Sequence, residues 1–220
     1  MKIQKKDVEN IIDASLGSTP APTILQVQNF VKKTLNYDFA VTLTEPFFVK
    51  HCADILHDAG KKLVTVISYP LGGMGDEGKI AQIKRAVSDG ADELDISMDI
   101  SAFKSGKYAQ VKEGLQRAID ASDGKLCKLI YFAALLDVDE QKRACEMAIE
   151  LGFPYVKTNT GFGYVTTLEE VKLVKENYGD QLKVMASGGV RTKEDAISMI
   201  EAGASRIATS SAFEIVEQFN

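Results

Sequence analysis

The sequence predicts a single-domain α/β protein, a (β/α)8 TIM barrel over residues 1–220, and three observations lead to this prediction. Eight short apolar stretches alternate with longer amphipathic stretches, which is the pattern of parallel strands connected by helices. A chain of 220 residues has the size that one such barrel uses as a single domain. Apolar residues make up 45% of the chain, enough for a core without disulfides or metals.

The predicted strands are short and several are almost continuously apolar, as expected for strands that are covered on both faces. They are Ile11–Leu16, Asp38–Thr44, Leu63–Ser68, Glu93–Ser97, Cys127–Ala133, Tyr155–Lys157, Leu182–Ala186 and Arg206–Ala208. Eight strands of this kind indicate a closed barrel.

Amphipathic stretches between these strands predict the helices. They are Ile24–Leu35, Pro46–Ala59, Asp76–Asp89, Tyr108–Ala121, Asp139–Leu151, Thr167–Tyr178, Thr192–Glu201 and Ser211–Gln218. Threonines followed by acidic residues mark two helix starts, at Thr167 and Thr192. A glycine that can adopt a left-handed conformation follows five of the helices: Gly60, Gly90, Gly152, Gly179 and Gly203.

An open, doubly wound sheet is the alternative architecture, because it is built from the same strand and helix units. The sequence does not favour it. No G-x-G-x-x-G motif opens the first helix, and the glycines at 72–75 lack the Lys-Ser/Thr ending of a phosphate-binding P-loop.

Charge and cysteine content limit the class of protein. A net charge of −5 argues against nucleic-acid binding, which depends on clustered Lys and Arg. Cys52, Cys127 and Cys145 form no C-x-x-C pair, so we expect reduced thiols and no zinc site. The charged N-terminus and the short apolar runs predict a cytoplasmic protein with no membrane association.

Lys157 is the first candidate for chemistry, because it ends an apolar strand and precedes a polar loop. In a barrel of this type, reactive groups lie at the carboxyl ends of the strands. A lysine without hydration has a lowered pKa and can attack a carbonyl group. A solvated lysine at a strand end is an equally good interpretation at this stage.

Acidic and basic residues inside predicted strands are the next candidates. Glu93 and Asp95 are two residues apart and share one strand face, so Asp95 could relay protons near the strand end or form a structural ion pair. Lys128 and Asp13 also lie within strands, where a charge is costly unless it is paired. We expect them to pair across the barrel interior, in a structural or a proton-transfer role.

Two polar turns follow the last two predicted strands. Gly188 and Gly189 follow the seventh strand, and Ser210 and Ser211 follow the eighth. Loops at these positions commonly bind phosphate through backbone N–H groups and hydroxyls. Ordinary turn and helix-cap chemistry is the alternative for both.

Five segments together resemble the 2-deoxyribose-5-phosphate aldolase family of class I aldolases, over nearly the whole chain. Residues 156–162, V-K-T-N-T-G-F, are similar to its Schiff-base motif K-T-S-T-G-F, and residues 187–192, S-G-G-V-R-T, to its S/A-G-G-V/I-R-T motif. Residues 89–95, 69–72 and 203–207 resemble its D-G-A-D-E-I/V-D, F-P-x-G and G-A-S-R-I/F segments.

The resemblance implies a carbon–carbon lyase that cleaves 2-deoxy-D-ribose 5-phosphate reversibly to D-glyceraldehyde 3-phosphate and acetaldehyde, without a metal or organic cofactor. It implies that Lys157 forms the Schiff base and Asp95 relays protons, and that Lys128 and Asp13 match polar active-site positions. It also implies phosphate contacts for Gly188, Gly189, Ser210 and Ser211. The expected partners are small molecules, a sugar phosphate and an aldehyde, and a homodimer is left open.

Met185 departs from the family pattern, which places a second lysine there. A cation next to Lys157 would lower its pKa and increase its reactive fraction. Lys183, two residues earlier on the same strand, and Lys128 are the candidate replacements. Phe132, where an acidic residue is common in the family, also departs from it. An aldolase with another phosphorylated substrate and a non-catalytic sugar-phosphate-binding barrel therefore remain alternatives.

Overall fold

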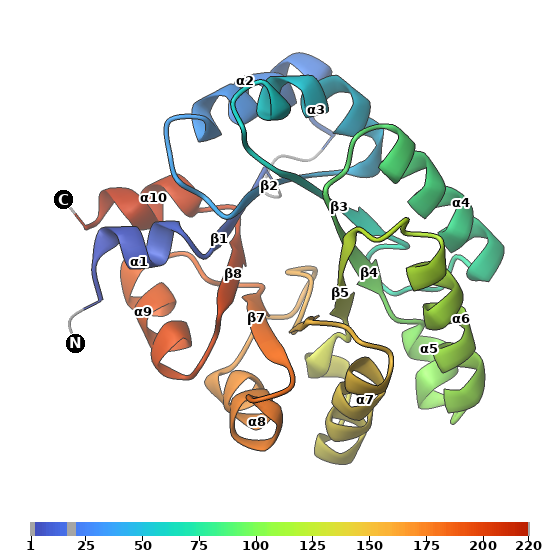
Figure 1. The fold of residues 1–220 in the computed structure, drawn as a ribbon. Coiled ribbons are helices and arrows are strands. Elements are labelled where there is room, and N and C mark those ends of the chain that lie inside the picture. The colour runs from blue at the N-terminus through green and yellow to red at the C-terminus, as the bar shows by residue number, and fades with distance from the viewer. Residues whose placement is uncertain (1–2, 17–20, 220) are drawn as a thin grey trace.

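The computed structural model describes residues 3–16 and 21–219, and in it the chain closes into a parallel eight-stranded barrel, β1 to β8 in sequence order (Figure 1). The strands are β1 (Ile12–Ser15), β2 (Val41–Thr44), β3 (Leu63–Ile67), β4 (Glu93–Ser97), β5 (Leu126–Ile130), β6 (Tyr155–Lys157), β7 (Lys183–Ser187) and β8 (Arg206–Thr209). β8 pairs with β1 and closes the ring. The predicted single-domain (β/α)8 barrel is confirmed.

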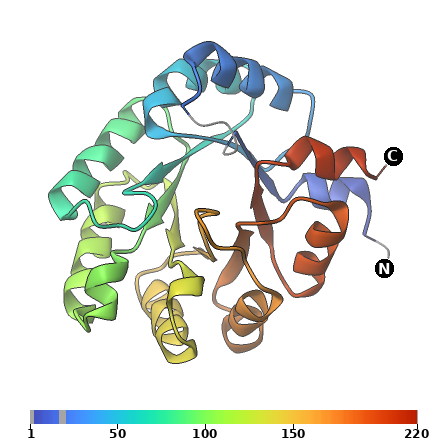
Figure 2. The same cartoon turned by 180° about the vertical axis from the view of Figure 1, so that it is seen from behind.

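Helices form an outer ring around the barrel, as both views show (Figures 1 and 2). They are α1 (Lys5–Glu9), α2 (Ile24–Thr34), α3 (Val49–His57), α4 (Asp76–Ser88), α5 (Ile100–Lys104), α6 (Tyr108–Asp120), α7 (Val138–Glu150), α8 (Leu168–Tyr178), α9 (Lys193–Glu201) and α10 (Ala212–Glu217). Two 3-10 turns, η1 (Pro46–Phe48) and η2 (Ala133–Leu135), follow β2 and β5. Among the described residues, none of the helices is both long and apolar enough to cross a bilayer.

Helix starts follow the predicted caps. The Thr167 hydroxyl accepts from the Glu170 N–H at 3.2 Å, and the Thr192 hydroxyl accepts from the Asp195 N–H at 3.1 Å. Both satisfy a backbone donor that the first helical turn leaves free. The short helices α1 and α5 were not predicted, because five residues show too little periodicity to be recognised.

Four of the five glycines predicted to end helices are left-handed, with φ of 67°, 103°, 77° and 109° at Gly60, Gly90, Gly152 and Gly203. The prediction is wrong for Gly179, which is right-handed with φ of −57°. Position 179 still requires a glycine, because a Cβ there would lie 2.4 Å from the Lys175 carbonyl oxygen.

The predicted fifth strand, Cys127–Ala133, is too long, because β5 ends at Ile130. Phe132 adopts a left-handed backbone with φ of 51°, and η2 follows it directly. The apolar run continues through the turn because these residues are buried there, so hydrophobicity alone could not mark the strand end.

Candidate active site

Lys157 is buried at the carboxyl end of β6, with only 3% of its surface exposed. Its Nζ lies 2.6 Å from Oδ2 of Asp95, which comes from β4 on the far side of β5. Burial excludes the solvated-lysine interpretation. The amine instead lies inside the barrel, held by a single carboxylate.

Strand alternation explains why these side chains meet. Glu93, Asp95 and Ser97 occupy alternate positions of β4, and contacts of the first two with Lys128 show that this face points into the barrel. Asp95 pairs in register with Lys128. Lys157 therefore reaches Asp95 across the inside of β5.

Lys128 connects three carboxylates in the barrel interior. Its Nζ lies 3.0 Å from Oδ2 of Asp13, 2.9 Å from Oε2 of Glu93 and 2.9 Å from Oδ1 of Asp95. The expected pairing of Lys128 with Asp13 across the interior is confirmed. Both side chains are fully buried, so each ion must be neutralised by such contacts.

Arg206 on β8 completes this cluster and was not among the predicted site residues. Its Nε donates to Oδ1 of Asp13 at 2.7 Å, and its Nη1 donates to Oε2 of Glu93 at 3.0 Å. An arginine inside a predicted strand was the available signal, because such a charge needs a buried partner. The cluster, called here the interior ion network, holds three carboxylates and three cations: Asp13, Glu93, Asp95, Lys128, Lys157 and Arg206.

The network fixes the charge state of its central members. Burial alone would raise the pKa of Asp95, but the ammonium groups of Lys128 and Lys157 outweigh it and lower that pKa to about 2. Burial would lower the pKa of Lys128, but its three carboxylate neighbours raise it overall. For Asp13, burial dominates and raises the pKa. Asp95 is thus an anion that two ammonium groups share.

Met185 lies beside Lys157, since the two are register partners on β7 and β6. Its side chain is fully buried, so an apolar thioether stands where the family pattern would place a lysine. The prediction that Lys183 approaches Lys157 is wrong. Lys183 begins β7 at the opposite end of the barrel, and its exposed side chain places Nζ 5.4 Å from the ring centre of Tyr155.

Comparisons with known proteins show the family of the chain. A deoxyribose-phosphate aldolase of Staphylococcus carnosus is 39% identical over 212 residues, covering 96% of this chain and 96% of that one. The deoxyribose-phosphate aldolase of Streptococcus suis is 42% identical over 198 residues, with 90% of each chain covered. The chain belongs to the deoxyribose-phosphate aldolase family.

Solved structures show the same barrel. One described as "QR15, an Aldolase" is 40% identical, with a TM-score of 0.91 and coverage of 97% of this chain and 96% of that one. The deoxyribose phosphate aldolase from Aeropyrum pernix, described as tetrameric, is 28% identical with a TM-score of 0.88 over 98% and 92%. The sequence profile of the dihydroorotate dehydrogenase family matches residues 164–219 alone. That segment excludes Lys157 and leaves the aldolase family assignment unchanged.

The loop between β6 and α8 projects toward the middle of the barrel ring (Figures 1 and 2). It carries Phe162 and Tyr164, whose rings contact Tyr69 and Phe132 with centres 5.5 and 5.4 Å apart. The Thr166 N–H donates to the Gly188 carbonyl at 2.9 Å. In this member of the deoxyribose-phosphate aldolase family, the loop is therefore fastened to strand ends on several sides.

Two of the four predicted phosphate residues, Gly188 and Gly189, lie next to this loop. Gly188 and Gly189 are left-handed, with φ of 104° and 83°, and a Cβ on Gly189 would lie 2.7 Å from the Val165 side chain. Both glycines are thus needed for loop packing, whatever they bind. Ser210 is exposed and Ser211 half-buried, and the Ser211 N–H already donates to the Thr209 hydroxyl at 2.9 Å.

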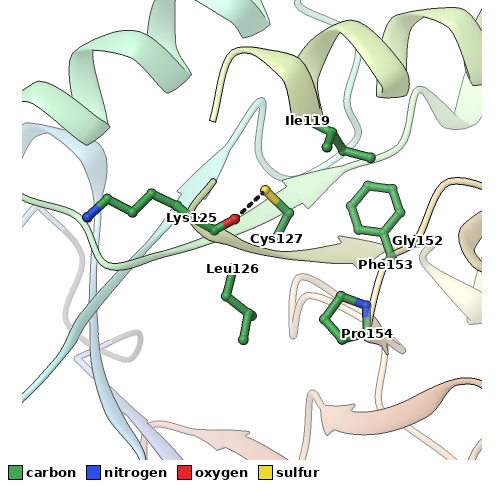
Figure 3. Close-up of a pocket in the computed structure, with 7 residues that line it drawn as sticks. All are labelled: Ile119, Lys125, Leu126, Cys127, Gly152, Phe153 and Pro154. Atoms are coloured by element: carbon green, nitrogen blue, oxygen red, sulfur yellow. Dashed lines mark hydrogen bonds between the residues drawn. The ribbon is translucent and has the colours of Figure 1, made fainter. Parts of the chain in front are cut away.

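Two surface cavities of this aldolase-family chain lie away from the candidate active site. One of about 230 Å³ lies at the amino end of β5 and β6, around Cys127 and Phe153 (Figure 3). Another of about 260 Å³ lies between η2, α7 and α8. Neither is lined by Lys157 or Asp95, so the candidate site is defined by the ion network and by neither of these cavities. The two histidines lie away from it on or near α3, and His57 pairs with Asp92 at 3.0 Å.

Proposed function

We propose that this protein is a class I aldolase that cleaves 2-deoxy-D-ribose 5-phosphate reversibly to D-glyceraldehyde 3-phosphate and acetaldehyde. The reaction would proceed through a Schiff base on Lys157. The observation that carries the proposal is the buried Lys157 Nζ, 2.6 Å from Asp95 Oδ2, in a chain of the deoxyribose-phosphate aldolase family.

In this proposal Asp95, 2.6 Å from the Lys157 amine, takes the proton that Lys157 must lose before it can act as a nucleophile. The neutral amine then adds to the C1 carbonyl, and the carbonyl oxygen takes the proton that the attacking nitrogen loses, which gives a neutral carbinolamine. Asp95, now protonated, returns its proton to that oxygen, which leaves as water while the nitrogen electron pair forms the C=N⁺ bond. The net change is one carbonyl exchanged for an iminium ion and one water released.

The iminium ion then accepts electrons during cleavage. A base removes the C3 hydroxyl proton, the C2–C3 bond breaks, and its electron pair forms an enamine on Lys157. Glyceraldehyde 3-phosphate departs, C2 takes a proton, and water hydrolyses the resulting iminium ion to acetaldehyde. Every step uses protein side chains and water, so the proposal includes no cofactor.

We assign the substrate phosphate to the turns after β7 and β8, at Gly188, Gly189, Ser210 and Ser211. Support comes from their position at the carboxyl end of the barrel and from the exposed Ser210 hydroxyl. Ser210→Ala with Ser211→Ala should raise the KM for the phosphorylated sugar and leave that for 2-deoxyribose unchanged. A glycine substitution would be a poorer test, because it displaces Val165.

Product analysis tests the function as a whole. Purified protein with 2-deoxyribose 5-phosphate should yield acetaldehyde and glyceraldehyde 3-phosphate in equal amounts, and the reverse reaction should consume both. Cleavage of a different sugar phosphate from a panel, with this one unchanged, would indicate a related aldolase of other specificity. Saturable sugar-phosphate binding without turnover of any of them would indicate a binding protein.

We place this reaction in the breakdown of deoxyribose phosphate in the cytoplasm. The three cysteines are free and buried, as suits a reducing compartment. Light scattering would test whether the chain forms a homodimer.

A further inference from the structure

Ser97 ends β4 with a buried hydroxyl that has no hydrogen-bond partner in the described structure. The side chain is only 1% exposed, so bulk solvent does not reach the hydroxyl. A buried hydroxyl without a partner costs free energy of folding. Such a group in a reactive centre indicates a partner that arrives with the substrate.

The position of Ser97 is set by the strand. It is two residues beyond Asp95 on the inward face of β4, roughly 7 Å nearer the carboxyl end where substrates enter. Ser97 pairs in register with Ile130, and Ile130 pairs with Lys157. Because barrel strands are tilted, such register partners are offset along the barrel axis, and the contact of Lys157 with Asp95 places Ser97 one layer above the Lys157 amine, on the side where substrates enter. Because Lys157 extends to Asp95, its Nζ lies on the β4 side, next to Ser97 along that strand.

Hydroxyl groups in and around the loop after β6 are already occupied. The hydroxyls of Thr158 and Thr166 lie 2.6 Å apart, and Thr166 donates to the Ser187 carbonyl. The Tyr69 hydroxyl donates to the Thr160 carbonyl. Both oxygens of Asp95 are held by ammonium groups, and Met185 offers no donor from β7. Ser97 is therefore a neutral donor without a partner, one layer above the Lys157 amine on the side where substrates enter.

We propose that Ser97 is a substrate-contacting residue whose hydroxyl donates to the substrate oxygen on C1, first as the carbonyl and then as the carbinolamine hydroxyl. The proposal rests on the Schiff-base function proposed for Lys157. Ser97 keeps its own proton throughout, and the proton that completes the leaving water comes from Asp95. The donor polarises the carbonyl toward attack and stabilises the oxygen as it gains electron density.

Ser97→Ala tests this role in the full-length protein. We expect kcat for cleavage, and the rate at which borohydride traps acetaldehyde on Lys157, to fall about tenfold, the factor expected for one lost hydrogen bond. KM should change little, since the contact strengthens after binding. The melting temperature should stay the same or rise, because the unpaired hydroxyl is gone.

Two further variants separate this role from a structural one. Ser97→Thr keeps a hydroxyl and should retain most of the trapping rate. Thr44→Val removes another buried, unpartnered hydroxyl, but Thr44 shares the face of Thr42, which contacts Thr34 of α2 outside the barrel. Its trapping rate should match that of the parent protein.

The outcomes are distinguishable. If the parent traps acetaldehyde and Ser97→Ala traps it equally fast, the role of Ser97 is wrong while the Schiff-base function stands. A parent protein that traps no aldehyde on Lys157 would overturn both proposals. An equal loss of rate in Ser97→Ala and Thr44→Val would assign the effect to packing and also contradict the proposal.

Discussion

The deeper and the upper parts of the barrel interior differ in how completely their polar groups are paired. In the deeper part, Lys128 contacts three carboxylates and Arg206 contacts two. In the upper part, Lys157 has one carboxylate partner, Ser97 has none and Met185 is apolar. The deeper groups are arranged for stability, whereas the upper groups retain the capacity to bind something else. Asp95 belongs to both parts, because one of its oxygens contacts Lys128 and the other contacts Lys157.

Replacing Lys157, the proposed nucleophile, should have the largest effect. Lys157→Arg keeps a cation for Asp95 but removes the primary amine, so turnover should fall by at least about a thousandfold because no iminium ion can form. Folding stability should stay close to that of the parent. Cleavage kinetics and urea unfolding measure the two effects. Residual turnover within tenfold of the parent would contradict the assigned role.

Removing a charge from the deeper part of the ion network should mainly lower folding stability. Lys128→Met leaves Asp13, Glu93 and Asp95 with too little positive charge, and we expect a loss of about 3–5 kcal/mol in unfolding free energy. Lys183→Met is the matched control, since Lys183 is exposed and outside the network. Urea denaturation compares the pair. Equal stability of the two variants would show that the network does not stabilise the fold.

Folding stability should fall at acidic pH as Asp95 becomes protonated. Its pKa of about 2 lies below the ordinary 3.8, so it contributes stability above pH 3.8 that is lost as the pH falls toward 2. The slope should be about 1.4 kcal/mol per pH unit, for one proton bound preferentially by the unfolded chain. Asp13, whose pKa is raised, contributes with the opposite sign at and above pH 3.8. Asp95→Asn should flatten the slope below pH 3.8, and an unchanged slope would refute the assignment.

Met185→Lys should have the smallest effect of the four changes. It would add a charged group to the upper part of the barrel interior, which would then resemble the deeper part more closely. A fourth cation beside Lys157 would lower its pKa, so the alkaline-rising limb of the pH–rate profile should move to lower pH and activity near neutrality should rise. The same cation unbalances the network and should lower stability. Met185→Leu is the control for packing. No movement of the limb would mean that Lys157 does not depend on a cation at that position.

Much of this molecule could be predicted from its sequence, because strand and helix periodicity determines the barrel. The charges of Asp13, Asp95 and Lys128 could be placed inside it, since buried ions in strands need partners. Lys183 shares the strand face of Met185 but begins the strand, where solvent offers a lower free energy than the filled interior. The end of β5 and the missing partner of Ser97 depend on backbone angles and on neighbours distant in sequence, which no local pattern encodes.

Locating the covalent adduct tests the central claim most directly. The protein would be incubated with acetaldehyde and borohydride, digested, and mapped by peptide mass spectrometry, with Lys157→Arg and Lys128→Met treated in parallel. The account predicts a single N-ethyl-lysine at Lys157 in the parent and none in Lys157→Arg. An adduct on Lys128 or Lys183, or none on Lys157 at saturating aldehyde, would contradict it.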